Sequence, residues 1–375
     1  MRWFGRKAAS EAPGRPFLLG AAWGSGGELW PRSYEAQVRE AYLGNAVAQR
    51  CVRLVSEAVG SVAVDEAGAE AKERRWPSAD YVSTSSGRVG LLLSGGLLET
   101  AATHLLLHGN AFLHVGLDAR GAPGRLFALR PERVKVVADA SGWPSGYRYK
   151  AGGAERSYAA EAVIHVRGVH PLDDHYGLGC LGAAAAAVAV HNAAARWNKA
   201  LLDNAARPSG ALVYDPGDGS VLAPAQYERL KAEMAAEFAG SGNAGRPMLL
   251  EGGLKWQALS LSPADMDFVE IKAAAAREIA LAFGVPPMLV GLPGDNAYAN
   301  YREAVRSLWR LTVLPMAGKI LDAVGERLGL RLAVDADQVS ALHADRAELW
   351  AQVSAADFLS VAEKREMLGF SREAE

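Results

Sequence analysis

Apolar residues recur at alternating steps of three and four over 266–283, which predicts one long amphipathic helix. Ser262-Pro263 and Asp265 are typical of a helix start, because they supply a capping hydroxyl, a proline where no N–H is needed and a capping acid. Gly284 and Pro286-Pro287 predict its end. The apolar stripe consists of Met266, Val269, Ala273, Ala276, Ala280 and Phe283.

A second helix is predicted from about Ala297, after a loop rich in Gly, Pro, Asp and Asn. Its apolar face continues through Ile320, Leu321, Val324 and Leu328. Because Pro315 lies inside this pattern, we expect a long, kinked helix. Residues 330–339 are typical of a strand that rejoins a sheet, and two short helices are expected at 340–356 and 361–368.

The first half of the chain mixes helical and strand patterns. A helical pattern over 34–60 is interrupted at Gly44-Asn45, and an apolar helix over 89–108 is expected to end at Gly109-Asn110. Short β-type runs follow at 111–115, 125–130, 133–137, 146–150 and 162–167, with turns at 118–121 and 152–153. These patterns predict an α+β module over about 35–170, with helices packed on an antiparallel sheet.

Thirteen apolar residues at 178–190 precede a more polar run that ends near 207–210. This length is short of the roughly 18–20 residues that cross a bilayer. The many alanines indicate close helix–helix packing, and contact between subunits is favoured over contact within the fold. Residues 211–258 then form a compact insert, with two strand-like runs around an amphipathic helix at 223–238.

Composition indicates an ordinary soluble protein. The 375 residues suffice for two or three domains, half are apolar, and the formal net charge is −2. No polybasic arm is present, so tight electrostatic binding of nucleic acid is not expected. Two cysteines, Cys51 and Cys180, fit a reducing cytoplasm. Residues 1–33 are expected to be a disordered tail, and 65–88 a loop.

The best candidate for enzyme chemistry is a group of histidines and aspartates, namely His165, His170, Asp173, Asp174 and His175. Such residues can bind a catalytic metal, so a metal-dependent hydrolase is one alternative. Intervals of five do not place side chains on one helix face, and the chain lacks a phosphate-binding G-x-x-x-x-G-K-[ST] loop, a G-x-S-x-G nucleophile motif and a sequence-reading DNA motif. We therefore expect no catalytic residues, no metal and no cofactor.

A family resemblance indicates a structural protein instead of an enzyme. The segment AAAREIALAFGVPPMLVGLPGDNAYANYREAVRSLWRLTVLP resembles portal (head-to-tail connector) proteins of long-tailed bacteriophages and related gene transfer agents. Separated motifs extend the resemblance over about 35–330: HLLLHGNAFLHV, LRPERVKVV, VIHVRG, GLGCLGAAAAA, RWNKALLDNAARPSGAL and GRPMLLEGGLKW. The chain departs from the family pattern at 65–90, which lacks an Asn-Pro-rich element, and in its short C-terminal part.

The resemblance implies an α+β portal fold with an α/β wing, a two-helix stem, a small α/β clip and a helical crown. Its expected segments are a tail (1–33), wing (34–177), stem helix (178–208), clip (209–260), stem helix (261–285), tunnel loop (286–299), C-terminal wing (300–339) and crown (340–375). The wing's second part would carry the long kinked helix.

By the same resemblance, twelve subunits form a ring at one capsid vertex of a virion assembled in the bacterial cytoplasm. Double-stranded DNA would pass through without sequence specificity, and the ring would contact the terminase large subunit, the head–tail adaptor and the major capsid protein, but no membrane. The residues expected to face DNA are Met288, Leu289, Gly291, Gly294, Asp295, Asn296 and Tyr298. Ala184, Ala187, Ala273, Ala276 and Ala280 are expected to pack the stem, and Glu228, Arg229 and Lys231 to dock the motor or adaptor.

Overall fold

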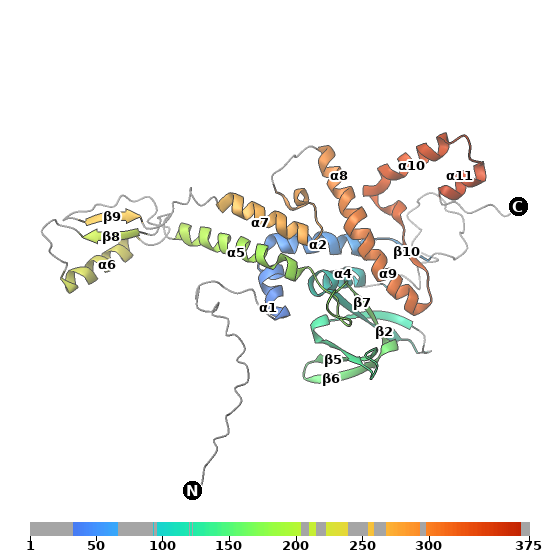
Figure 1. Cartoon of the computed structure of the whole chain (residues 1–375), viewed down its shortest axis with the longest axis horizontal. Coiled ribbons are helices and arrows are strands. Elements are labelled where there is room, and N and C mark those ends of the chain that lie inside the picture. The colour runs from blue at the N-terminus through green and yellow to red at the C-terminus, as the bar shows by residue number, and fades with distance from the viewer. Residues whose placement is uncertain are drawn as a thin grey trace, which may run out of the picture.

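The computed structural model describes residues 33–66, 93, 96–119, 121, 123–203, 210–214, 223–238, 254–258, 268–292 and 298–368. Figure 1 shows a mixed body of helices and strands from which two long helices, α5 and α7, project side by side. A small unit of β8, β9 and α6 lies beyond their outer ends. Residues 1–32 of the predicted tail (1–33), residues 67–88 of the predicted loop (65–88) and the predicted helix cap at 262–265 lie outside the described residues. Ser33 is described and caps α1, so it does not belong to a tail.

The described helices include nearly all of those that the sequence predicts. They are α1 (Tyr34–Val38), α2 (Ala46–Gly60), α4 (Leu97–His108), α5 (Leu181–Asp203), α6 (Pro224–Phe238), α7 (Phe268–Ala282), α8 (Tyr298–Leu308), α9 (Leu314–Leu328), α10 (His343–Ala355) and α11 (Val361–Met367). The strands are β1 (Val64–Glu66), β2 (Asn110–Leu117), β3 (Pro123–Leu129), β4 (Val134–Ala138), β5 (Pro144–Ala151), β6 (Ala154–Ala159), β7 (Val163–Arg167), β8 (Gly210–Tyr214), β9 (Leu254–Ala258) and β10 (Leu332–Val334).

Strands β2 to β7 form two three-stranded antiparallel sheets instead of the single sheet that we expected. One has the order β3-β2-β7 and the other β4-β5-β6. Strand β6 was not predicted, because its residues are mostly polar and five of the six are exposed. The expectation that 330–339 rejoins the main sheet is wrong: β10 pairs with β1, with Ala333 opposite Asp65.

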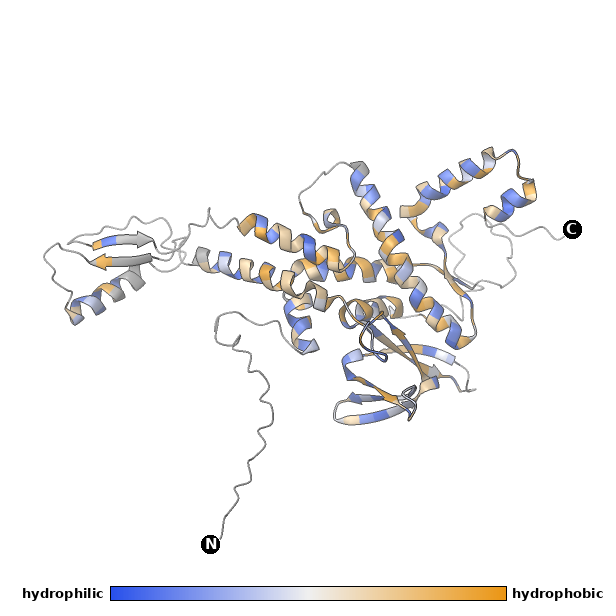
Figure 2. Ribbon diagram, in the orientation of Figure 1, coloured by the Kyte–Doolittle hydropathy of each residue, from blue (hydrophilic) through white to orange (hydrophobic). Residues whose placement is uncertain are grey.

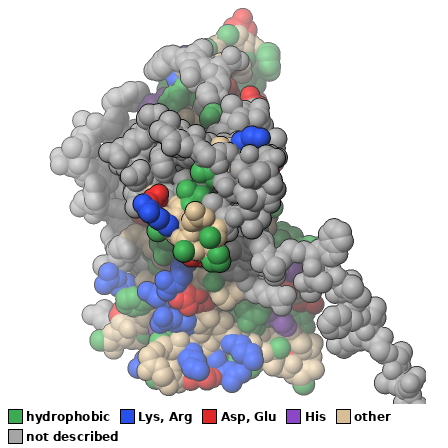
Figure 3. Space-filling view, turned by 90° about the vertical axis from the view of Figure 1, so that its left-hand side faces the viewer, with side chains coloured by type: hydrophobic (Ala, Val, Ile, Leu, Met, Phe, Trp, Pro, Cys, Tyr) green, Lys and Arg blue, Asp and Glu red, His purple; other side chains and the backbone are tan. Residues whose placement is uncertain are grey.

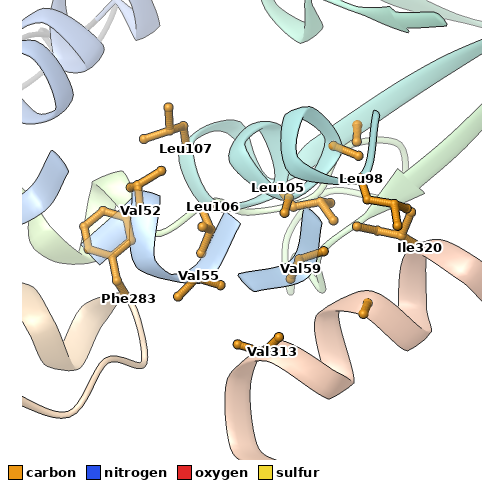
Figure 4. Close-up of a cluster of buried hydrophobic side chains, with 14 of the residues drawn as sticks. Val52, Val55, Val59, Leu98, Leu105, Leu106, Leu107, Phe283, Val313 and Ile320 are labelled. Carbon is orange, nitrogen blue, oxygen red and sulfur yellow. The ribbon is translucent and has the colours of Figure 1, made fainter. Parts of the chain in front are cut away.

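The main core lies where α2 and α4 meet the inner ends of α7 and α9. Figure 4 shows Val52, Val55 and Val59 of α2 facing leucines of α4, with Phe283, Val313 and Ile320 closing the cluster. Hydrophobic residues, drawn in orange, concentrate at this junction in Figure 2. Each fully buried Val, Leu or Phe contributes roughly 1.5–3 kcal/mol. This junction therefore anchors the helix pair α5/α7 to the body.

A smaller core fills the space between the two sheets. Phe112 of β2 is fully buried there and contacts Tyr147 of β5 at 5.7 Å between ring centroids. Val134, Val136, Leu129 and Val163 complete the cluster. The inward side chains of β4 and β5 are thus apolar, and their other face points away from the body.

The long C-terminal helix is interrupted by a π-turn, Trp309–Val313, between α8 and α9. Pro315 follows in the first turn of α9. Since proline has no N–H, it cannot donate to the carbonyl four residues earlier, and the wider π-turn precedes it. The helix is therefore irregular next to Pro315, where a kink was predicted, and the irregularity is a π-turn.

No helix in the described part of the chain is long and apolar enough to cross a membrane. Both cysteines are free, and burial raises the pKa of the Cys51 thiol to about 12. A thiol that stays protonated is a poor nucleophile.

Candidate functional site: the helix pair and the loop that follows it

Helices α5 and α7 pack along each other in opposite directions (Figure 1). Ala184 and Ala187 of α5, and Ala276 and Ala280 of α7, are at most 4% exposed within the single chain. Ala273 is partly buried. Small side chains let the two helix backbones approach closely, so the burial of these alanines needs no neighbouring subunit.

Other apolar side chains of the same pair remain exposed. They are Val190 (46%) and Trp197 (41%) on α5, and Val269 (80%), Ile271 (43%) and Leu281 (78%) on α7. Trp197 also stacks on Phe268, with ring centroids 5.9 Å apart. Exposed apolar side chains on a pair of helices are candidates for contact with another protein surface.

The start of α5 is fixed by a close crossing of glycine backbones. Gly168 N–H donates to the Gly109 carbonyl at 2.8 Å, and Cys180 N–H donates to the Leu106 carbonyl at 2.8 Å. A Cβ on Gly109 would lie 2.3 Å from the backbone of Leu178, and its φ of +81° also favours glycine. The side chain of Asn110 closes the crossing by accepting from Gly177 N–H at 2.7 Å.

A buried polar cluster joins the middle of α5 to the N-terminal segment. The Asn45 amide donates to Asn192 Oδ1 at 2.8 Å and lies 3.1 Å from His191 Nδ1. Asn192 in turn donates to the Glu40 carboxylate at 2.8 Å, and Arg196 lies 3.3 Å from the same carboxylate. Asn45 Oδ1 also caps α2 by accepting from two backbone N–H groups. The sequence patterns do not predict this cluster, although an Asn at a helix start is one visible signal.

The root of the predicted tunnel loop is rigid. Gly284, with φ +66°, ends α7, and its carbonyl accepts from the Thr312 hydroxyl at 2.7 Å. Val285 is buried, and Pro287–Val290 form a 3₁₀ turn whose Leu289 packs on the main core. Gly291 ends this turn with φ +79°.

The predicted DNA-facing residues therefore divide into three groups. Met288 and Leu289 are partly buried in the 3₁₀ turn, and Gly291 is exposed. Gly294, Asp295 and Asn296 lie outside the described residues. Tyr298 is the first residue of α8, and its side chain is not among those described.

The predicted docking residues lie on α6. Glu228 and Arg229 are exposed, and Arg229 pairs with Glu233 at 3.0 Å on the same helix. Lys231 belongs to the same helix, but its side chain lies outside the described set.

The histidine–aspartate group does not form a metal site. No three His, Cys, Asp or Glu side chains within the described ranges, which include all five candidates, are grouped to hold a metal ion. His165 instead lies 3.0 Å from Asn110 Oδ1 and stacks on Phe112 at 4.1 Å. His170 Nδ1 accepts from Leu172 N–H, while Asp173 accepts from the backbone N–H groups of His175 and Tyr176. His165 therefore packs within strand β7, while His170 and Asp173 shape the loop that follows.

Burial dominates the ionisation of two histidines, His104 and His165. It lowers the pKa of His165 to about 3, helped by the nearby Arg167, and the pKa of His104 to about 4. Both imidazoles are therefore neutral at pH 7. The Nδ1 atoms of His104 and His175 are buried and have no hydrogen-bond partner.

Two long helices leading to and from a small α/β tip, with a rigid turn and a second helix beyond, define a connector-type subunit. The phage portal protein family model matches residues 46–369, so the chain belongs to this family.

Solved structures agree. The chain is 45% identical, with a TM-score of 0.68, to a chain in the virion of a native gene transfer agent particle, covering 94% of this chain and 98% of that one. It is 46% identical, with a TM-score of 0.66 and covering 94% and 98%, to a chain in the neck of such a particle determined with C12 symmetry. A protein of Rickettsia felis is 38% identical over 88% of both chains. The expected α+β portal fold is confirmed.

Proposed function

We propose that twelve copies of this chain form a ring at one vertex of a gene transfer agent capsid. Double-stranded DNA passes through the ring during packaging and ejection. One observation carries this proposal: the chain resembles, over almost its whole length, a protein in a gene transfer agent neck determined with C12 symmetry. In this assignment α5 and α7 are the stem, and β8, β9 and α6 are the clip.

The exposed apolar residues of the stem are the contacts to neighbouring copies. Because Ala184, Ala187, Ala276 and Ala280 are buried within one chain, they hold α5 against α7. Val190, Val269 and Leu281 face outward and are available to the next subunit. A ring needs such a head-to-tail contact, which repeats until the rotation closes.

The connection from α7 to α8 is the channel loop. Its root is held by Gly284, Thr312 and the 3₁₀ turn, so only the part beyond Gly291 is left to face DNA. Segment 292–298 carries one acid and neither Lys nor Arg. Its contacts with DNA are therefore polar and weak, since each neutralised phosphate adds to a salt-dependent hold.

The clip helix α6 is the contact for the terminase large subunit and later for the head–tail adaptor. Its exposed Glu228 and Arg229 belong to a mixed-charge face, which suits reversible contacts. The wing would then meet the major capsid protein. Charge reversal at Arg229 and Lys231 should lower packaging without loss of the ring, and unchanged packaging would reject this role.

The channel assignment is tested by packaging assays on particles with Asn296→Lys and Tyr298→Lys. We expect intact rings with slower DNA packaging or retained DNA on ejection, because the added cations bind phosphates. The control is Lys319→Gln on the exposed face of α9, a change of charge outside the loop. Packaging and ejection at wild-type rates in the lysine variant would reject a channel-facing loop.

A further inference from the structure

The outer face of the β4-β5-β6 sheet is a basic surface. Register places Lys135 opposite Arg148, and Arg148 opposite Ser157, in one row across the three strands. Lys150, two residues beyond Arg148, shares this face and stands opposite Glu155. We call Lys135, Arg148 and Lys150 the basic sheet face. All three side chains belong to exposed residues.

The arrangement has an electrostatic cost. Like charges directly opposite each other on neighbouring strands destabilise a sheet, and Lys135 and Arg148 are such a pair. The nearby acid Glu155 lies 3.3 Å from Arg148 and also stands opposite Lys150, so one carboxylate serves two cations. The face keeps an excess of positive charge.

The excess extends to the surrounding module. Residues 130–167 contain seven Lys and Arg against four Asp and Glu, a net charge of +3 in a chain whose net charge is −2. In Figure 3, Lys and Arg side chains gather in the lower part of the molecule, at the level where Figure 1 shows β5 and β6. The inward face of the same sheet packs Val134, Val136 and Tyr147 against the body, so the basic face points away from it.

We propose that the basic sheet face binds the phosphate backbone of double-stranded DNA, outside the channel and without reading sequence. Duplex DNA carries one negative charge per about 1.7 Å of its axis, so a flat surface with cations about 5–7 Å apart can meet several phosphates. The face offers only three cations and one acid, so a single subunit holds DNA weakly. This agrees with the absence of a polybasic arm.

The strength of the contact rests on the proposed ring, because a closed ring repeats the face in every subunit. Linked weak sites raise overall avidity by roughly 10²–10⁴ when several can engage one ligand. DNA lying against the outside of the ring would touch the basic sheet faces of adjacent subunits, while DNA in the channel touches other residues. The two modes of contact are separable by experiment.

The test uses the full-length protein and relaxed, covalently closed circular DNA. A closed circle has no end that could enter the channel, so its retention reports only outer surfaces. Sizing first establishes that rings are present, and gel-shift titrations then measure retention at about 50 and 200 mM salt. Wild-type rings should retain the circle at the lower concentration and release most of it at the higher one.

The variant Lys135→Glu with Lys150→Glu should weaken retention at low salt by about tenfold or more and flatten its dependence on salt. Lys135→Gln with Lys150→Gln only removes charge and should reduce DNA retention by less. It replaces the first variant as the test if the charge reversal disturbs the sheet. Lys319→Glu on α9, a single charge reversal outside the sheet, is the control and should bind like wild type.

Wild-type rings that fail to retain the circle would overturn the proposal. Retention equal to that of wild type in both double variants (Glu and Gln) would also overturn it. The basic sheet face would then be a candidate site for an acidic protein surface instead of DNA. Loss of retention in Lys319→Glu equal to that in the variants would also overturn it, since net charge alone would then explain binding. If the wild-type protein forms no ring, the proposed function itself fails, and this outcome is visible in the sizing step.

Discussion

The hydroxyl of Thr312 donates a hydrogen bond of 2.7 Å to the carbonyl of Gly284, across 28 residues of sequence. The bond joins the end of α7 to the π-turn that precedes α9. A Cβ on Gly284 would lie 2.9 Å from the same hydroxyl, so the two residues fit each other closely. The loop that follows Gly284 is therefore anchored at its start.

Thr312→Val should loosen this root while the ring remains intact. The substitution keeps the shape and removes the donor, which costs about 0.5–1.5 kcal/mol. Amide hydrogen exchange over 285–292 should become faster than in the wild-type ring. Thr312→Ser keeps the hydroxyl and is the control; equal exchange in the valine and serine variants would show that the bond does not hold the loop.

Gly109→Ala should prevent correct folding of the junction between α4 and α5. The new Cβ would lie 2.3 Å from the Leu178 backbone, a cost of roughly 4 kcal/mol or more, because backbone must move. Gly142→Ala is the matched control: its φ is also positive, at +87°, but nothing lies within 4 Å. It should cost only about 1–2 kcal/mol. Equal urea unfolding midpoints for Gly109→Ala and Gly142→Ala would contradict the close backbone contact between Gly109 and Leu178.

Ala276→Leu should destabilise the single chain before any ring forms. Ala276 is 2% exposed, so the three added carbons must displace the side chains or backbone packed around it, at about 1–3 kcal/mol. Ala274 is exposed on the same helix, and Ala274→Leu should change subunit stability by less than about 0.5 kcal/mol. Urea unfolding at concentrations below ring formation measures both. A stable Ala276→Leu subunit that fails only in assembly would place this alanine between subunits instead.

Acid should destabilise the fold through the buried histidines. The pKa values of His104 and His165 are lowered in the folded chain to about 4 and 3, from 6.5. Below pH 6.5 the unfolded chain takes up protons that the folded chain does not, so stability is full above 6.5 and falls as pH drops toward 4. Each histidine contributes a slope of about 1.4 kcal/mol per pH unit in that range.

Thermal unfolding between pH 7.5 and 4.5 checks this expectation. His104→Leu should lower the dependence on pH, because it removes a group whose pKa is lowered by folding. His343→Leu, at the exposed start of α10, is the control for replacing a histidine by leucine. A His104→Leu slope equal to that of wild type would contradict the assignment.

Sequence patterns were sufficient where local chemistry decides the structure. The end of α4 at Gly109, the turn at Gly152-Gly153 and the end of α7 before Pro286 follow from glycine and proline, and all three are confirmed. Strand β6 was not predicted, because its mostly exposed residues do not alternate between apolar and polar.

Long-range contacts escaped prediction for a different reason. The pairing of β10 with β1, and the contact of Asn45 with Asn192, join residues more than 140 positions apart. Nothing in local periodicity identifies such partners. For the same reason the stem alanines could be placed on one helix face from sequence, but whether that face meets its own chain or a neighbour required the structure.

The central claim is that the chain forms a closed ring of twelve. Electron microscopy of the purified full-length protein, with particle mass measured on the same sample, tests it most directly. We expect end-on views with twelvefold symmetry around a central opening, and a mass about twelve times the 39.7 kDa of the chain. Monomers or small oligomers without an opening, under conditions where the fold is intact, would contradict the account.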